Sequence, residues 1–236
     1  MNVSDYINEP GKPVRIWEGD CLELMREMED GCVDAVVTDP PYNLGARTFF
    51  TANRATGEVF SRSQSLGEWD EGFPLESFAK DMIRVTRNVL MAFASDGQIP
   101  VWLALLPDAV IGAWVKTNPM PHLRPSAVRR VHEHLILWGP VGGDSVIVAP
   151  TDTTTFAGGR PRHPTLKPEW VIECLVARAR PGDLILDPFL GSGTTGAVCD
   201  RLGRRWIAAE ISPTYVQMAT ERIERARQQL KLPMEV

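Results

Sequence analysis

The residues best suited to chemistry stand at the ends of two apolar runs that lie far apart in the chain. The first run, residues 33–38, is followed directly by the segment Asp39-Pro40-Pro41-Tyr42. The second run, residues 184–186, is followed by a glycine-rich segment, residues 187–196. Open α/β sheets bind their ligands outside the carboxyl ends of the strands. The two segments therefore predict two halves of one site.

The first segment predicts a pocket for a flat molecule that carries an amino group. The exocyclic amine of a purine or pyrimidine is a poor nucleophile, because its lone pair is delocalised into the ring. If Asp39 accepts one N–H and the carbonyl of Pro40 accepts the other, that lone pair can face an incoming methyl group. Pro41 stiffens the loop, and Tyr42 offers a ring on which a base rotated out of a helix can stack. The alternative is a Pro-Pro turn with a buried tyrosine.

The second segment predicts a nucleotide-shaped cofactor site. Residues 191–196 fit the pattern G-x-G-x-x-G, and Glu210 follows at a distance suited to a ribose hydroxyl. Taken alone, this pattern suggests a dinucleotide. After Gly196, however, the chain offers one helix, one strand (206–210) and a last helix, which cannot complete a six-stranded dinucleotide domain. The rest of the sheet must come from the N-terminal half, so the order of the elements looks circularly permuted.

Alternating strands and helices are predicted to position these segments. The hydrophobic pattern indicates strands at 14–17, 33–38, 89–94, 110–115, 134–138, 184–186 and 206–210. It indicates helices at 21–28, 75–89 and 168–179, and a last helix that begins after the N-cap Ser212. This alternation predicts an α/β fold with a doubly wound, mostly parallel sheet that is covered on both faces.

Three motifs, in this order, resemble the β class of amino-methyltransferases that act on DNA. Residues 38–44 are similar to the substrate motif of the family, residues 163–168 to the segment before its cofactor loop, and residues 187–195 to its S-adenosylmethionine loop. Weaker similarity covers residues 17–22, 114–119 and 133–138. The resemblance implies a methyltransferase fold with permuted motif order and a methyl group transferred from S-adenosylmethionine to a base amine by direct in-line attack.

The resemblance also implies roles for individual residues. Catalysis is assigned to Asp39, Pro40, Pro41 and Tyr42. Cofactor binding is assigned to Asp20, Cys21, Thr165, Lys167, Asp187, Phe189, Gly191, Gly193, Thr194, Thr195 and Glu210. Gly191 and Gly193 would leave room for the methionine part, Lys167 would contact the amino acid end of the cofactor, and Glu133 is expected to be a buried partner near the pocket. As alternatives, Asp187 could cap its strand and Lys167 could be a polar residue at a helix start.

The target predicted from the resemblance is N6 of adenine. Aspartate at the first motif position accompanies adenine more often in this family, and Asp39 stands there. The alternatives are an N4-cytosine DNA methyltransferase, a methyltransferase for RNA or protein glutamine, and a non-catalytic DNA-binding or decoy subunit. The resemblance extends to enzymes of restriction-modification systems.

Contacts to double-stranded DNA are predicted despite a net charge of −5, which gives no general basic footprint. The candidates are Lys116, Arg124, Arg129, Arg130, Arg160 and Arg162, which gather in two stretches. The alternative is that these stretches are solvated loops. Residues 45–73 are expected to form a mobile or DNA-contacting loop, and residues 139–162 to be a short remnant of a recognition region. So small a recognition region suggests pairing with a second copy.

The whole chain, residues 1–236, is expected to be one catalytic domain. No apolar stretch approaches the roughly 20 residues needed to span a bilayer, and the first residues do not resemble a signal peptide, so a cytoplasmic protein is expected. The four cysteines lack the spacing of a zinc site. His132 and His134 alternate on a strand without a nearby carboxylate or cysteine to complete a set, so no metal is expected.

Overall fold

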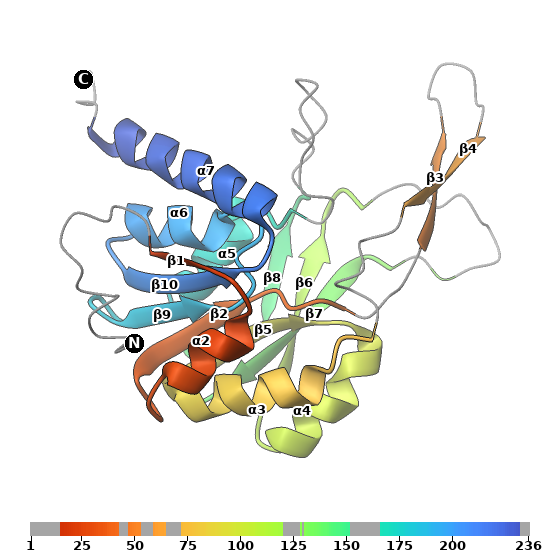
Figure 1. The fold of residues 1–236 in the computed structure, drawn as a ribbon. Coiled ribbons are helices and arrows are strands. Elements are labelled where there is room, and N and C mark those ends of the chain that lie inside the picture. Colours follow the sequence, from red (N-terminus) through yellow and green to blue (C-terminus); the bar gives the residue numbers. More distant parts are fainter. Residues whose placement is uncertain are drawn as a thin grey trace.

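The computed structural model describes residues 15–42, 47–52, 59–64, 72–119, 128, 130–151 and 166–231. Its main body is an eight-stranded sheet in the order β1, β10, β9, β2, β5, β7, β6, β8 (Figure 1). The strands are β1 (Ile16–Glu18), β2 (Val33–Thr38), β5 (Thr86–Ala94), β6 (Val110–Lys116), β7 (His132–Trp138), β8 (Val146–Ala149), β9 (Leu184–Asp187) and β10 (Arg205–Glu210). Within this sheet β7 is antiparallel to both β5 and β6, and the other pairs are parallel. The predicted mostly parallel sheet is confirmed.

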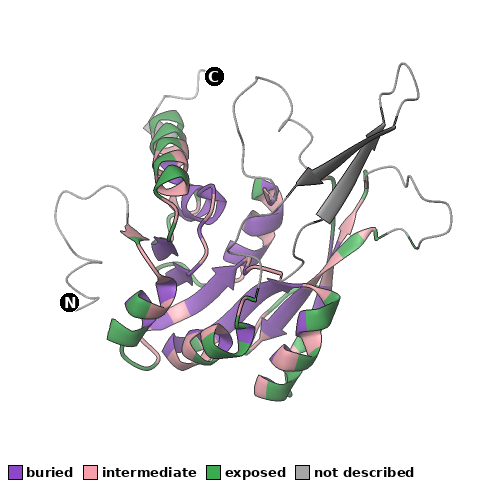
Figure 2. Cartoon of the chain, turned by 45° about the vertical axis from the view of Figure 1, so that its right-hand side comes forward, coloured by how far each residue is buried: buried purple, intermediate pink, exposed green. Residues whose placement is uncertain are grey.

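Helices cover both faces of the sheet, as a doubly wound fold requires (Figure 1). One face carries α2 (Cys21–Glu27), α3 (Leu75–Val85) and α4 (Ile99–Leu105), and the other carries α5 (Glu169–Val176), α6 (Thr194–Arg201) and α7 (Pro213–Lys231). The central strand β5 shows why. Met91 and Phe93 pack in the core of the α5, α6 and α7 side, whereas Leu90 and Ala92 pack in the core of the α2, α3 and α4 side. Successive side chains of a strand point to opposite faces, and here both are buried (Figure 2).

The first and last parts of the described chain complete the sheet together. β1 pairs with β10 in parallel, with Trp17 in register with Ala209. The backbone N–H of Gly19 donates to the carbonyl of Glu210 at 3.0 Å. The permuted order predicted from the sequence is therefore realised, and it brings the start of α2 next to the end of β10.

One predicted helix is too long. The pattern over residues 75–89 predicts a single helix, but α3 ends at Val85 and β5 begins at Thr86. The hydroxyl of Thr86 donates to the carbonyl of Met82 at 2.6 Å, and Thr86 already pairs with Val33 of β2. Pairing with a buried neighbouring strand thus overrides a helical period that Val89 happened to satisfy.

Several elements lie where the sequence predicted none. A short 3₁₀ turn, Asp96–Gln98, leads into α4. β8 falls inside the predicted recognition remnant, 139–162, yet it belongs to the main sheet through its pairing with β6. Two strands, β3 (Arg47–Ala52) and β4 (Val59–Gln64), form an antiparallel hairpin inside the predicted loop 45–73.

Candidate active site

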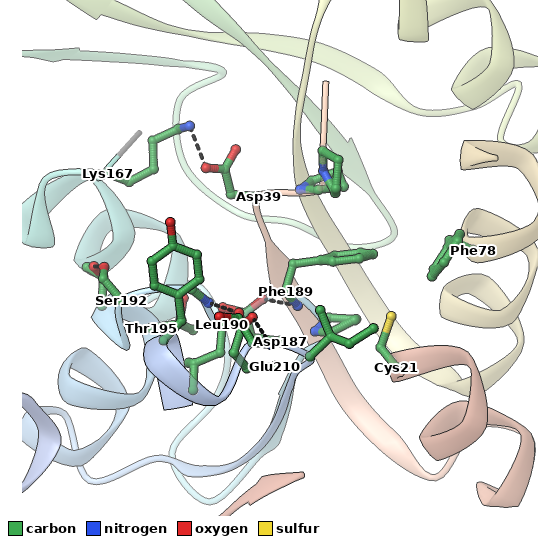
Figure 3. Close-up of a pocket in the computed structure, with 18 of the residues that line it drawn as sticks. Cys21, Asp39, Phe78, Lys167, Asp187, Phe189, Leu190, Ser192, Thr195 and Glu210 are labelled. Carbon is green, nitrogen blue, oxygen red and sulfur yellow. Dashed lines mark hydrogen bonds and ion pairs between the residues drawn. The ribbon is translucent and has the colours of Figure 1, made fainter. Parts of the chain in front are cut away.

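Neighbouring strands bring the two predicted halves of the site together. β2 and β9 are adjacent, with Val36 in register with Leu186, so the segments that follow them leave the sheet side by side. The hydroxyl of Thr38 donates to Oδ1 of Asp187 at 2.8 Å and ties the two strand ends. Beyond them lies a cavity of about 330 Å³ (Figure 3). Small-molecule sites typically measure about 300 to 1,000 Å³.

Most of the predicted site residues line this one cavity. They are Asp20, Cys21, Asp39, Pro40, Pro41, Tyr42, Lys167, Asp187, Phe189, Gly191, Thr194, Thr195 and Glu210. Thr165 lies outside the described residues. The cavity is also lined by Phe73, Phe78 and Tyr215, which the sequence analysis did not assign to the site. Phe78 belongs to the amphipathic helix α3, and a core position and a pocket position look alike in a hydrophobic pattern.

Glu210, at the end of β10, is held by backbone groups of two loops. Its Oε2 accepts from the N–H of Gly191 at 2.8 Å, and its Oε1 accepts from the N–H of Ser212 at 2.8 Å. Burial raises the pKa of this carboxyl above its ordinary value, although these backbone donors lower it. Each carboxylate oxygen has about two acceptor positions, so Glu210 can still accept two further hydrogen bonds from a ligand.

The two glycines of the cofactor loop have different surroundings. Gly191 has φ 54° and lines the cavity. Gly193, the N-cap of α6, has φ 84°, and a Cβ there would stand 2.7 Å from Cα of Ala219 in α7. The structure therefore gives Gly193 a reason other than the predicted room for the cofactor, because its missing side chain lets α7 approach α6.

An apolar wall closes the side of the cavity near α2. The rings of Phe73 and Phe78 lie 4.5 Å apart between centroids, and that of Phe189 lies 5.5 and 5.6 Å from them. Cys21 stands at the start of α2, where the Asp20 carboxylate caps the helix by accepting from the N–H of Leu22 at 2.8 Å. Burial raises the pKa of the Cys21 thiol well above its usual range, so this side chain contributes a neutral surface.

Asp187 is buried where the two halves meet. Burial raises the pKa of its carboxyl to about 6, although the hydroxyls of Thr195 and Thr38 and the N–H of Phe189 lower it. The last of these donates to Oδ1 at 3.1 Å. Asp187 thus stands at the end of its strand, as predicted, and also lines the cavity (Figure 3).

Asp39 is paired with Lys167 (Figure 3). Its Oδ2 accepts from Nζ of Lys167 at 2.6 Å, and the same ammonium lies 3.1 Å from Oε2 of Glu133. The other oxygen, Oδ1 of Asp39, is buried and receives no hydrogen bond from the residues that the structure describes. Lys167 therefore stands on the side of the cavity that the sequence assigned to the amine, rather than free for the amino acid end of the cofactor.

The loop that carries Asp39 is fixed through its carbonyls. The carbonyl of Pro41 accepts from Nε2 of Gln98 at 2.6 Å, and that of Tyr42 accepts from Oγ of Ser95 at 3.2 Å. The hydroxyl of Tyr42 donates to Oε2 of Glu133 at 3.0 Å. Glu133 was expected to be a buried partner near the pocket, and it makes this contact from a position that is only partly buried. No pattern in the sequence pointed to Gln98, because the 3₁₀ turn that holds it was not predicted.

Opposing influences set the charges around Asp39. Burial raises the pKa of the Asp39 carboxyl, and the attraction of Lys167 offsets this only in part. Burial lowers the pKa of Lys167, but the carboxylates of Asp39 and Glu133 raise it by more, so its net shift is upward. Burial works against ionisation of Glu133 as well, yet Lys167 and Lys116 hold its pKa at about 2.

Two of the residues predicted to contact DNA lie within the described parts of the chain, and both are paired with carboxylates. Lys116 lies 2.5 Å from Oε1 of Glu133, so a phosphate contact by Lys116 would require this ion pair to break. Arg130 is exposed and lies 2.7 Å from Oδ2 of Asp96. The remaining candidates, Arg124, Arg129, Arg160 and Arg162, lie outside the described residues.

The described residues hold neither a metal-binding cluster nor a membrane-spanning helix. No group of three or more His, Cys, Asp or Glu side chains among them could hold a metal ion. Within the same residues, no helix has both the length and the apolar character to cross a bilayer.

Comparison with known proteins gives the same classification as the motifs. A family model described as DNA methylase matches residues 129–221. The chain is 28% identical over 272 residues to the type II methyltransferase M.Cfr9I of Citrobacter freundii, covering 89% of this chain and 87% of the relative. It is 24% identical over 269 residues to the type II methyltransferase M.HinfI of Haemophilus influenzae, covering 94% of this chain and 70% of the relative.

A solved structure shows the same fold. The M1.HpyAVI–SAM complex superimposes with a TM-score of 0.63 at 23% identity, covering 88% of this chain and 98% of that one. The family resemblance and the methyltransferase fold predicted from the sequence are therefore confirmed: the chain is similar to type II methyltransferases over most of its length and to the DNA methylase family model over residues 129–221.

Proposed function

We propose that this protein transfers a methyl group from S-adenosylmethionine to N6 of an adenine that has been rotated out of double-stranded DNA. The observation that carries the proposal is that two carboxylates of different character line one cavity. Glu210 keeps acceptor positions suited to a ribose, and Asp39 keeps a buried oxygen that receives no hydrogen bond from the described residues. The site can thus hold a nucleoside cofactor and an amine at the same time.

The cavity fits S-adenosylmethionine, whose bound form supplies a methyl group activated on a sulfonium. Glu210 would accept from both ribose hydroxyls, and the apolar wall of Phe73, Phe78 and Phe189 would pack against the adenine beside Asp20 and Cys21. Asp187 would add a carboxylate near the positively charged end. The similar M1.HpyAVI structure is a complex with SAM, which supports this choice of cofactor.

On the amine side, Asp39 would accept one N–H through Oδ1 while Lys167 holds Oδ2. The carbonyl of Pro40 would accept the other N–H, since those of Pro41 and Tyr42 already accept from Gln98 and Ser95. Two acceptors on one amino group direct the nitrogen lone pair toward the methyl group. A base that enters can stack on the Tyr42 ring.

The choice of adenine depends on Asp39 at the first motif position. Digesting DNA from cells that express the protein and separating the nucleosides by mass spectrometry tests it. We expect N6-methyladenine. N4-methylcytosine without N6-methyladenine would mean that the target is cytosine and not adenine, although the enzyme class would stand. The absence of both products would refute the proposal.

The DNA contacts and the assembly are also proposals. The phosphate contacts would come from Arg124, Arg129, Arg130, Arg160 and Arg162, and a second copy would extend the surface that contacts the duplex. Light scattering at micromolar concentration, with and without DNA, should show a dimer. A monomer under both conditions would refute the pairing.

A further inference from the structure

Two charged side chains stand behind the cavity without a role in the reaction as proposed. Among the described residues, neither Glu133 nor Lys116 lines the cavity, yet both belong to the ion-pair chain that ends at Asp39. We propose that Glu133 and Lys116 are positioning residues that act through Lys167 to orient Asp39 and to set its ionisation, with one oxygen available to the amine. This inference deepens the proposed function and rests on it.

The geometry forms a continuous chain across three parts of the fold. Lys116, at the end of β6, is paired with Oε1 of Glu133 on β7 at 2.5 Å. Oε2 of Glu133 lies 3.1 Å from Nζ of Lys167, just before α5, and this nitrogen lies 2.6 Å from Oδ2 of Asp39. Every link is within ion-pair distance, so a change at Lys116 can be transmitted to Asp39.

The burial of Lys167 explains why every ion pair between Lys116 and Asp39 is needed. The side chain of Lys167 is 8% exposed, and its ammonium lies 5.0 Å from the ring centroid of Tyr42 and 4.8 Å from that of Phe93. A buried charge without adequate partners is strongly unfavourable. Glu133 gives Lys167 a second carboxylate. Lys167 is therefore held between two anions and contacts only one oxygen of Asp39, Oδ2. Oδ1 then remains for the substrate.

The charges of the four ion-paired residues balance, so removing one charge should change the ionisation of Asp39 in a predictable direction. Two carboxylates and two ammonium groups sum to zero. Neutralising Glu133 leaves an excess positive charge and favours ionised Asp39, whereas neutralising Lys116 leaves an excess negative charge and opposes it. The other ionisable groups that act on Asp39 are Tyr42, on the same loop, and Asp187 of β9. Both variants keep these two residues, and the amide oxygen that Glu133→Gln introduces can still accept from the Tyr42 hydroxyl.

The experiment compares Glu133→Gln with Lys116→Met. Single-turnover methyl transfer to duplex DNA is measured against pH with saturating S-adenosylmethionine, and the Asp39 carboxyl carbon is titrated by ¹³C NMR, which needs no turnover. A charge within about 4 to 6 Å of an ionisable group typically shifts its pKa by 1 to 3 units, and a more distant charge shifts it by less. We therefore expect the acid limb and the NMR midpoint to move down by about one pH unit in Glu133→Gln and up by a smaller amount in Lys116→Met, because Glu133 and Lys167 separate Lys116 from Asp39.

A matched control removes a carboxylate from a surface pair. Glu76→Gln breaks the exposed contact of Glu76 with Lys80 at 2.6 Å and should move neither midpoint. Loss of packing alone has no reason to give shifts of opposite sign, so shifts in the same direction, or none, would overturn the inference. If Glu133→Gln does not fold, an upward shift in Lys116→Met still supports the inference and its absence overturns it.

The two readouts separate this inference from the function on which it rests. Wild-type protein that methylates DNA, with unshifted midpoints in both variants, refutes the role of the ion-pair chain and leaves the function intact. Wild-type protein that binds the cofactor but transfers no methyl group refutes the function, and the inferred role falls with it, whatever the NMR midpoints do.

Discussion

Replacing Gly193 with alanine tests how the cofactor loop is joined to the last helix. Gly193 has φ 84°, a left-handed conformation that costs other residues roughly 1 to 2 kcal/mol. The new Cβ would stand 2.7 Å from Cα and 2.9 Å from Cβ of Ala219, which is fully buried. These atoms belong to a packed helix and cannot turn aside as a flexible side chain would, so overpacking adds about 1 to 3 kcal/mol. The expected loss of unfolding free energy is therefore about 2 to 5 kcal/mol.

Thermal unfolding of matched variants measures this loss. In a chain of this size, 1 kcal/mol shifts the midpoint by roughly 2 to 4 °C, so Gly193→Ala should unfold about 4 to 20 °C below the wild type. Gly203→Ala is the control, because Gly203 has φ 64° but a Cβ there would meet nothing within 4 Å. It should lose the conformational part alone. Equal losses in the two variants would refute the close packing of Gly193 against Ala219.

Three further predictions concern the carboxylates of the cavity. Asp39→Ala should keep its affinity for S-adenosylhomocysteine in calorimetry but lower the single-turnover rate by about 10² to 10³, because it loses an acceptor used mainly in the transition state; an unchanged rate would remove Asp39 from that role. Glu210→Ala should weaken cofactor binding by about 1 to 3 kcal/mol in the same calorimetry, and unchanged affinity would place the ribose elsewhere. Burial raises the pKa of Asp187 to about 6, so the folded state holds this proton more tightly than the unfolded chain, and the resulting stability is lost as pH rises through 6. The unfolding free energy of Asp187→Asn relative to that of the wild type should therefore rise by on the order of 2 to 3 kcal/mol between pH 4 and pH 7. The same difference between the two proteins at both pH values would contradict this.

The sequence predicts the strand ends of the site well, for a physical reason. Buried parallel strands read as continuous apolar runs, so the strands before Asp39 and Asp187 were located within a residue or so. The boundary between α3 and β5 was not, because Val89 fits the period of the helix as well as the core of the strand. Sheet pairing at Thr86 decides it.

The chain of ion pairs behind Asp39 could not be predicted in full. Glu133 was expected near the pocket, but its links to Lys116 and Lys167 arise because β7 lies antiparallel between β5 and β6. Chain order does not reveal such a placement. Lys116 therefore read as a basic residue available to DNA, whereas the structure pairs it with a carboxylate.

Transfer of a labelled methyl group to DNA tests the central claim most directly. Purified protein is incubated with trideuteromethyl S-adenosylmethionine and unmethylated duplex DNA, and the digested nucleosides are separated by mass spectrometry. We predict deuterated N6-methyladenine with the wild-type protein and a strongly reduced amount with Asp39→Ala. Wild-type protein that binds the cofactor but leaves every nucleoside unlabelled would contradict the claim.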